Sequence, residues 1–211
     1  MTFAFNELES LLKKAASGAG FSVGHAMVIA SAGVWLGRRG FAVCDIVGRA
    51  VAGGPRESVV RSVDGVTVFE AARVGVDGVA AVDLLLAGVA GDSVTLEDLD
   101  EPRLLIGLAG VAAKAHGVGF AIGTEACSLV IGDGSAIALA NVQLAGGETV
   151  VLRLRPDLSS VDGAALASRY DPAATADGSW TQIEQLAHKT YVPASDASRL
   201  SGAGAGLTDN D

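Results

Sequence analysis

The sequence predicts an α+β protein with an N-terminal layer of helices and two hairpin-containing antiparallel β segments that carry helices on one face. Helical periodicity dominates the first fifty residues, and two later pairs of β-rich runs each flank an Asp-Gly dipeptide. Half of the 211 residues are hydrophobic and the mean hydropathy is +0.43, which suffices for one buried core. We expect one domain, with a helical part at 1–55, a mixed α/β part at 56–155 and a C-terminal helix and tail at 156–211.

Three amphipathic helices are expected near the N-terminus, at residues 6–17, 23–39 and 43–51. Asn6 and Glu9 have the spacing of a capping box, and Gly18 follows the last periodic residue. Ser22 is the expected N-cap of the second helix. A Gly-Gly-Pro sequence ends the third helix, because no helix continues through it.

The middle of the chain alternates between strand and helix patterns. Expected strands are 59–63, 66–69, 93–96, 118–123, 128–131, 137–139 and 150–154, and expected helices are 79–86, 102–116 and 179–189. The Asp64-Gly65 and Asp133-Gly134 dipeptides favour type I′ turns and therefore hairpins. Whether the strands form one sheet or two stays open.

Charge and composition exclude several classes of function. The net charge of −9 would repel a nucleic acid or an anionic membrane. The chain has no uninterrupted apolar stretch of 18 residues and no signal-like N-terminus, and its two cysteines stand among apolar neighbours. We therefore expect a cytoplasmic protein in which Cys44 and Cys127 are buried structural thiols. His25 and His116 have no metal-ligand partner at a suitable spacing.

The C-terminal segment TYVPASDASRLSGAGAGLTDND has neither helix nor strand periodicity. Its glycines allow close approach of the backbone to a ligand, and its last three residues offer oxygen donors. One interpretation is that the segment folds over a cleft, with Asp209 and Asp211 holding a divalent cation. Substrate would then contact Ser195, Ser198, Arg199, Gly202, Gly204, Gly206 and Asn210. The alternative is a frayed terminus, which is typical of such compositions.

His188 and Tyr191 are the candidate catalytic residues, because an imidazole and a phenol near the tail could move protons. Arg199 could clamp a substrate carboxylate with two hydrogen bonds. Equally, His188 and Lys189 could simply complement a helix C-terminus while Arg199 is solvated. No nucleotide-binding loop, serine nucleophile elbow or HExxH zinc motif is present in the sequence.

The stretches NELESLLKKAASGAGFSVGHA, WLGRRG and YVPASDASRLSGAGAGLTDND resemble the two ends of an uncharacterised proteobacterial family, known only as a domain of unknown function. The resemblance extends over the chain and is weakest in the middle. It implies that the tail is ordered rather than frayed. It implies no reaction, because the family has no established activity.

Two functions follow from these observations. The first is a small enzyme of amino-acid or organic-acid metabolism that acts by acid–base chemistry on a carboxylate-bearing metabolite, with no nucleotide cofactor and with or without a divalent cation. The second is a non-catalytic subunit whose tail docks on a partner chain or across a homodimer. In both cases we expect a homo-oligomer.

Overall fold

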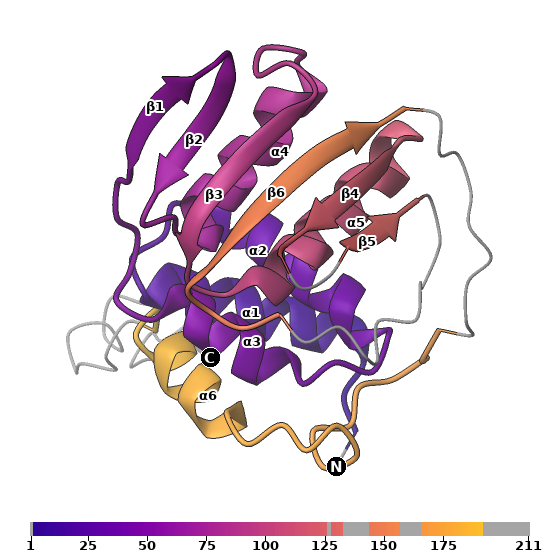
Figure 1. Ribbon diagram of the computed structural model, residues 1–211. Coiled ribbons are helices and arrows are strands. Elements are labelled where there is room, and N and C mark those ends of the chain that lie inside the picture. Colours follow the sequence, from indigo (N-terminus) through magenta and orange to yellow (C-terminus); the bar gives the residue numbers. More distant parts are fainter. Residues whose placement is uncertain (1, 126–127, 133–143, 157–165, 192–211) are drawn as a thin grey trace, which may run out of the picture.

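The computed structural model describes residues 2–125, 128–132, 144–156 and 166–191 of the chain. One sheet forms one side of the molecule, α4 and α5 cover one of its faces, and a layer of further helices adjoins them (Figure 1). The α+β class expected from the sequence is therefore confirmed. Of the C-terminal segment singled out in the sequence, residues 192–211 lie outside the described residues.

The N-terminal layer contains the three expected helices, α1 (Phe5–Gly18), α2 (Val23–Gly37) and α3 (Val43–Val51). α2 ends two residues before its predicted end, so Arg38 and Arg39 follow the helix instead of lying in its last turn. Ser22 is the N-cap of α2, and its Oγ accepts a hydrogen bond from the His25 N–H at 3.3 Å. The predicted capping box of α1 is wrong by two residues. Ala4 is the N-cap, and the Glu7 carboxylate accepts from its N–H at 2.7 Å. Glu9 consequently has no capping role, and its carboxylate accepts a hydrogen bond from Ser31 of α2 instead.

The first hairpin forms as predicted, from β1 (Val59–Val63) and β2 (Val66–Glu70). Asp64 and Gly65 have φ angles of 51° and 82°, which are the left-handed values that a type I′ turn requires. β1 forms one edge of the sheet.

The connection after β2 was only partly predicted. A π-helical turn, η1 (Val74–Gly78), precedes α4 (Val79–Leu86), and β3 (Ser93–Leu99) then pairs parallel to β2. The expectation of purely antiparallel β segments is therefore wrong at this point. The helix between the two strands carries the chain back to the end of the sheet where β2 begins. The second strand therefore runs in the same direction as the first.

All described strands join one mixed sheet in the order β1-β2-β3-β6-β4-β5. α5 (Pro102–His116) leads into β4 (Gly119–Gly123) and β5 (Ser128–Ile131), and β6 (Glu148–Arg155) lies between β3 and β4. The expected strand at 150–154 forms within β6 and pairs with β4 of the second hairpin segment. It also pairs with β3, so it joins the two segments into one sheet. The predicted Asp133-Gly134 turn and the 137–139 strand lie outside the described residues.

α6 (Trp180–His188) returns to the N-terminal layer and packs on α1. Phe3 and Tyr170 exchange backbone hydrogen bonds of 2.7 and 2.9 Å, and the Phe3 ring stacks on Trp180 with centroids 4.2 Å apart. The two ends of the described chain are thus tied together. In the part of the chain that the structure describes, no helix is long and apolar enough to cross a membrane.

Candidate functional site

The structure brings the two predicted catalytic residues into contact. The His188 and Tyr191 rings have centroids 5.3 Å apart at the end of α6. Lys14, which the sequence reading did not single out, donates from Nζ to the Tyr191 hydroxyl at 3.0 Å and lies over its ring. His188 and Tyr191 are exposed, so this cluster is a surface feature.

The remaining predicted site residues all lie outside the described part of the chain. These are Ser195, Ser198, Arg199, Gly202, Gly204, Gly206, Asp209, Asn210 and Asp211. Their assignment to substrate and metal binding therefore stays a prediction.

A pocket of about 480 Å³ lies where α1, α2 and α5 meet, and we call it the Trp35 pocket. Its apolar walls include Trp35, Val111 and Leu166. Its charged lining consists of Arg38, Arg39, Lys114 and Glu9. A concave site with apolar walls and a few convergent polar groups is typical of small-molecule binding.

Two glycines of α5 allow α5 to pack closely on α2 beside this pocket. A Cβ at Gly107 would lie 2.6 Å from the carbonyl oxygen of Ala32, and one at Gly110 would lie 2.2 Å from the Trp35 indole. α2 and α5 can therefore approach closely, and the Trp35 ring lies directly against the α5 backbone. Val111 and Lys114 follow Gly110 on α5, so the same packing places them at the pocket wall.

Arg39 has an unusual environment. Its guanidinium carbon is 3.4 Å from the centroid of the Trp35 ring, and Nη1 donates to the Trp35 carbonyl oxygen at 2.9 Å. Its Nε is buried and has no hydrogen-bond partner among the described residues. Burial, and secondarily the charge of Arg38, lower the pKa of Arg39 to about 10. A buried donor without a partner is unfavourable for the fold.

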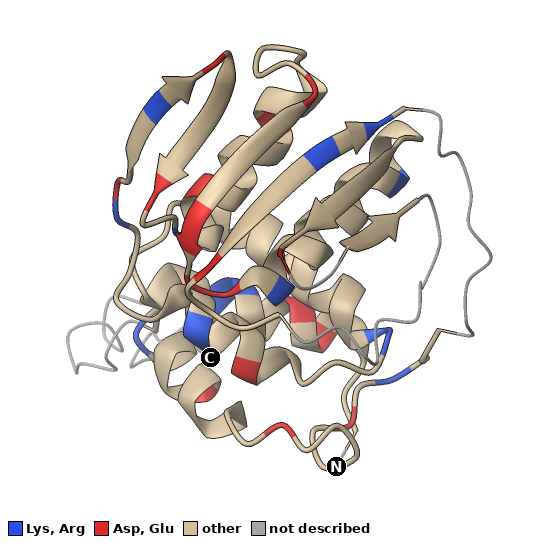
Figure 2. Ribbon diagram, viewed as in Figure 1, with Lys and Arg blue, Asp and Glu red and all other residues tan. Residues whose placement is uncertain are grey.

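The charge of the Trp35 pocket is opposite to that of the whole chain. Its three cations and one carboxylate give the lining a formal charge of +2, whereas the chain carries −9. Figure 2 shows acidic positions spread over both the sheet and the helical layer, including the ends of β2 and β3 that adjoin the helices. None of the four ion pairs among the described residues involves Arg38, Arg39 or Lys114.

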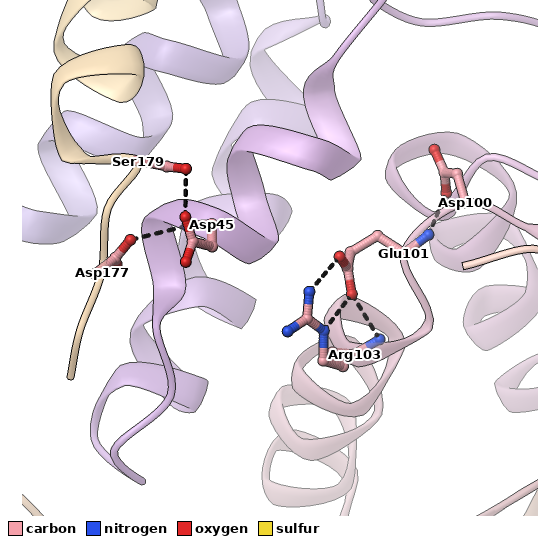
Figure 3. A network of polar contacts seen from close by, with 6 residues as sticks. All are labelled: Asp45, Asp100, Glu101, Arg103, Asp177 and Ser179. Carbon is pink, nitrogen blue, oxygen red and sulfur yellow. Dashed lines mark hydrogen bonds and ion pairs between the residues drawn. The ribbon is translucent and has the colours of Figure 1, made fainter. Parts of the chain in front are cut away.

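Two groups of buried carboxylates have structural roles instead. Figure 3 shows Asp177 at the N-terminus of α3, where it accepts from the Cys44 and Asp45 N–H groups at 2.6 and 3.0 Å. The Tyr170 hydroxyl donates to the same carboxylate, and Ser179 donates to Asp45. Burial and the nearby Asp177 raise the pKa of Cys44, so its thiol stays neutral.

The second group lies where β3 meets α5 (Figure 3). Glu101 binds Arg103 through two contacts of 2.6 Å, and Asp100 accepts from the Val74 N–H at 2.8 Å. Burial raises the pKa of Asp100. In the described residues no three His, Cys, Asp or Glu side chains are placed to hold a metal ion. These carboxylates therefore fix helix and loop ends.

A further pocket of about 460 Å³ lies on the sheet face opposite α4 and α5, over β4, β5 and β6. Small residues line it, together with Glu125 and Arg153, so its charges balance. It therefore lacks the charge surplus and the stacked aromatic group of the Trp35 pocket.

The Trp35 pocket was not predicted from the sequence. The sequence reading placed Arg38 and Arg39 in the last turn of a helix, where basic residues complement the helix dipole. The signal for this pocket in the sequence is the WLGRRG motif, because it contains the Trp35 ring and the guanidinium groups of Arg38 and Arg39.

Comparisons with known proteins give a partial match to one family model and no activity. Residues 3–91 match the model of a family described as "Protein of unknown function (DUF3726)". The resemblance to a family of unknown function is thus confirmed over those residues, while its proteobacterial origin and the tail motif remain untested. No curated protein matches the sequence.

Among solved structures, a malate dehydrogenase from Entamoeba histolytica aligns with 88% of this chain and 69% of its own, at 10% identity and a TM-score of 0.44. A likeness this weak supports no argument about fold or activity.

Proposed function

For a chain whose residues 3–91 match a family of unknown function, we propose that the Trp35 pocket binds a small molecule that carries a carboxylate beside an apolar group. The main support is Arg39, which lines the pocket, lies over the Trp35 ring and has no ion-pair partner among the described residues. Nη1 donates to the Trp35 carbonyl oxygen, and the guanidinium has further N–H donors that this bond does not use. A guanidinium can bind the two oxygens of a carboxylate.

Lys114 and Arg38 add positive charge around the same site, and Trp35, Val111 and Leu166 offer apolar contact to the rest of the ligand. Charges in a partly dry pocket interact more strongly than in water. Arg38 and Arg39 also repel each other, and a bound anion would relieve that repulsion. The pocket therefore binds anions even though the chain as a whole is acidic.

The test is a pair of ligands of equal shape, 3-phenylpropionate and 3-phenylpropanol, in thermal unfolding and calorimetric titration. We expect the acid to raise the unfolding midpoint, because a ligand at one hundred times its Kd stabilises a native state by about 2.7 kcal/mol. The alcohol should bind at least tenfold more weakly.

Arg39→Gln should abolish the response to the acid, and Arg56→Gln, an exposed position outside the pocket, should leave it unchanged. Equal binding of the acid and the alcohol, or an unaltered response of Arg39→Gln, would contradict the proposal.

Catalysis at Tyr191 is a second candidate, because Lys14 donates to its oxygen at 3.0 Å and His188 lies against its ring. This contact leaves the phenol proton directed away from Lys14 and available for transfer. With any carboxylate that wild type converts, Tyr191→Phe should lower kcat about 100-fold, whereas Lys13→Gln on the same helix should not. An unchanged kcat in Tyr191→Phe would exclude this role.

Several expectations from the sequence stay proposals. They are the divalent cation at Asp209 and Asp211, the clamp by Arg199, the docking of the tail on a partner chain, the homo-oligomer, and the cytoplasmic location.

A further inference from the structure

The Trp35 pocket contains one group that does not suit a simple anion site, and this group is Glu9. A carboxylate that shares a cavity with a bound carboxylate repels it. Glu9 is not neutralised by the basic residues of the pocket, because none of the ion pairs among the described residues includes it. Its hydrogen-bond partner is Ser31, whose hydroxyl donates to Glu9 Oε1 at 2.9 Å. The pocket thus presents a fixed negative group as well as its cations.

The positions of the charges are set by α2. Ser31, which holds Glu9, and the Trp35 carbonyl oxygen, which holds Arg39, are one turn apart in sequence. The Trp35 carbonyl points toward the C-terminus of α2, so Arg39 binds beyond Trp35 along the helix axis. The Glu9 carboxylate and the Arg39 guanidinium are therefore expected to lie between one and two helical turns apart, about 5–11 Å. An α-amino acid with a hydrogen bond at each end spans about 8–9 Å. Its ammonium and carboxylate therefore match the two ends of the pocket.

The walls between these ends decide which side chain fits. Val34, Val111, Ala115 and Leu166 have apolar side chains, and Trp35 adds an aromatic ring whose indole N–H is its one polar group. A volume of about 480 Å³ accommodates a large aliphatic or aromatic side chain. An acidic side chain would be placed near Glu9 or would compete for Arg39, so it is disfavoured.

Building on the proposed carboxylate site, we infer that its ligand is a free α-amino acid with an apolar side chain, whose ammonium binds Glu9 and whose carboxylate binds Arg39. Glu9 is then the residue that distinguishes an amino acid from the corresponding organic acid. Discrimination arises because the ammonium of the amino acid pairs with the Glu9 carboxylate, whereas the organic acid brings only a carboxylate that Glu9 repels.

The experiment compares L-phenylalanine, 3-phenylpropionate and 2-phenylethylamine by calorimetric titration of the full chain. These three differ only in the presence of the ammonium and the carboxylate. Wild type should bind phenylalanine at least tenfold more tightly than either of the other two. L-Leucine and 4-methylpentanoate form a second matched pair, for which the same order is expected.

In Glu9→Gln, phenylalanine should bind no more than threefold more tightly than 3-phenylpropionate. The affinity for 3-phenylpropionate itself should stay the same or increase. Ser31→Ala removes the hydrogen bond that positions Glu9 but keeps the charge of Glu9, so the preference should fall, but by less than in Glu9→Gln. Because Ser31→Ala leaves the carboxylate in place, an unchanged preference in this variant also counts against the inference if Glu9→Gln folds poorly.

The outcomes separate the two proposals. If wild type binds 3-phenylpropionate as tightly as phenylalanine, or if Glu9→Gln keeps the full preference, the amino-acid inference is wrong and the carboxylate site stands. If neither compound binds to wild type, the carboxylate site itself is wrong and the inference falls with it.

Discussion

Arg39 illustrates how a binding residue can cost stability. Its guanidinium is half-buried against Trp35 and next to Arg38, and both burial and the neighbouring charge lower its pKa to about 10. Stacking on the indole offsets part of this cost. An uncharged side chain that packs equally well should therefore preserve the stability of the fold but weaken the binding of a carboxylate.

We expect Arg39→Met to change the free energy of unfolding by no more than about 1 kcal/mol, because lost stacking and relieved repulsion oppose each other. The same change should weaken 3-phenylpropionate binding at least tenfold. Denaturant unfolding and calorimetry check the two parts. A loss of several kcal/mol would show that Arg39 supports the fold rather than the site.

Tyr170 is the residue through which the C-terminal segment is held on the helical layer. Its hydroxyl donates to Asp177 and accepts from the Val43 N–H at 3.1 Å, and its side chain is fully buried. Tyr170→Phe leaves both partners without this contact and should cost about 1–3 kcal/mol in denaturant unfolding. A change below about 0.5 kcal/mol would mean that the hydroxyl contributes little.

The pH dependence gives an independent check of Tyr170. Burial, and then the hydrogen bond to Asp177, raise its pKa above the value of the unfolded chain. The unfolded state therefore loses the phenol proton first, so the stability due to Tyr170 is complete below about pH 10 and declines as the pH rises above it. Between pH 9 and 11, wild type should lose more stability than Tyr170→Phe. Parallel pH profiles would contradict the assigned pKa direction.

At the level of elements, the contact between α1 and α6 depends on Gly18. A Cβ there would lie 1.9 Å from the Leu186 carbonyl oxygen, so the two helices must separate if any side chain is added. Gly18→Ala should destabilise the protein by about 1–3 kcal/mol, although alanine favours helices. Gly24→Ala in the first turn of α2 is the control, since its nearest neighbour atom is 4.0 Å away, and it should be neutral or stabilising. Equal effects of the two changes would contradict the close packing.

Most helices could be predicted because their signals are local. The apolar period of residues 6–17, the Ser22 cap and the Pro102 start all lie within a few residues of the element that they define. The π-helical turn at Val74–Gly78 had no such signal. It is fixed by Asp77, which accepts from the Arg73 N–H at 2.6 Å and from Ser58 at 2.7 Å, and Ser58 is distant in the sequence.

In the molecule as a whole, β1 is an exposed edge of the sheet. The type I′ turn places Val63 opposite Val66 in a hydrogen-bonded pair, so Val59, Arg61 and Val63 bond to β2. Val60 and Ser62 then direct their N–H groups to the outer side, where no described strand lies. Such an edge is available to another strand.

We expect the amides of Val60 and Ser62 to exchange hydrogen much faster than those of Val94 and Leu152 in the central strands. Amide exchange measured at two protein concentrations checks this. Protection of Val60 and Ser62 that is lost on dilution would instead show that copies of the chain pair through β1, as the expected homo-oligomer allows.

The sequence by itself determined the α+β class, the first hairpin and nearly every described helix, because periodicity, caps and turn residues act over short distances. Only the tertiary structure decided the single mixed sheet, since strand order depends on pairings between distant segments. It also decided the candidate site. Glu9 lies on α1, Arg39 follows the end of α2 and Lys114 lies on α5, and the close approach of α2 and α5 at Gly107 and Gly110 helps to bring them to one pocket.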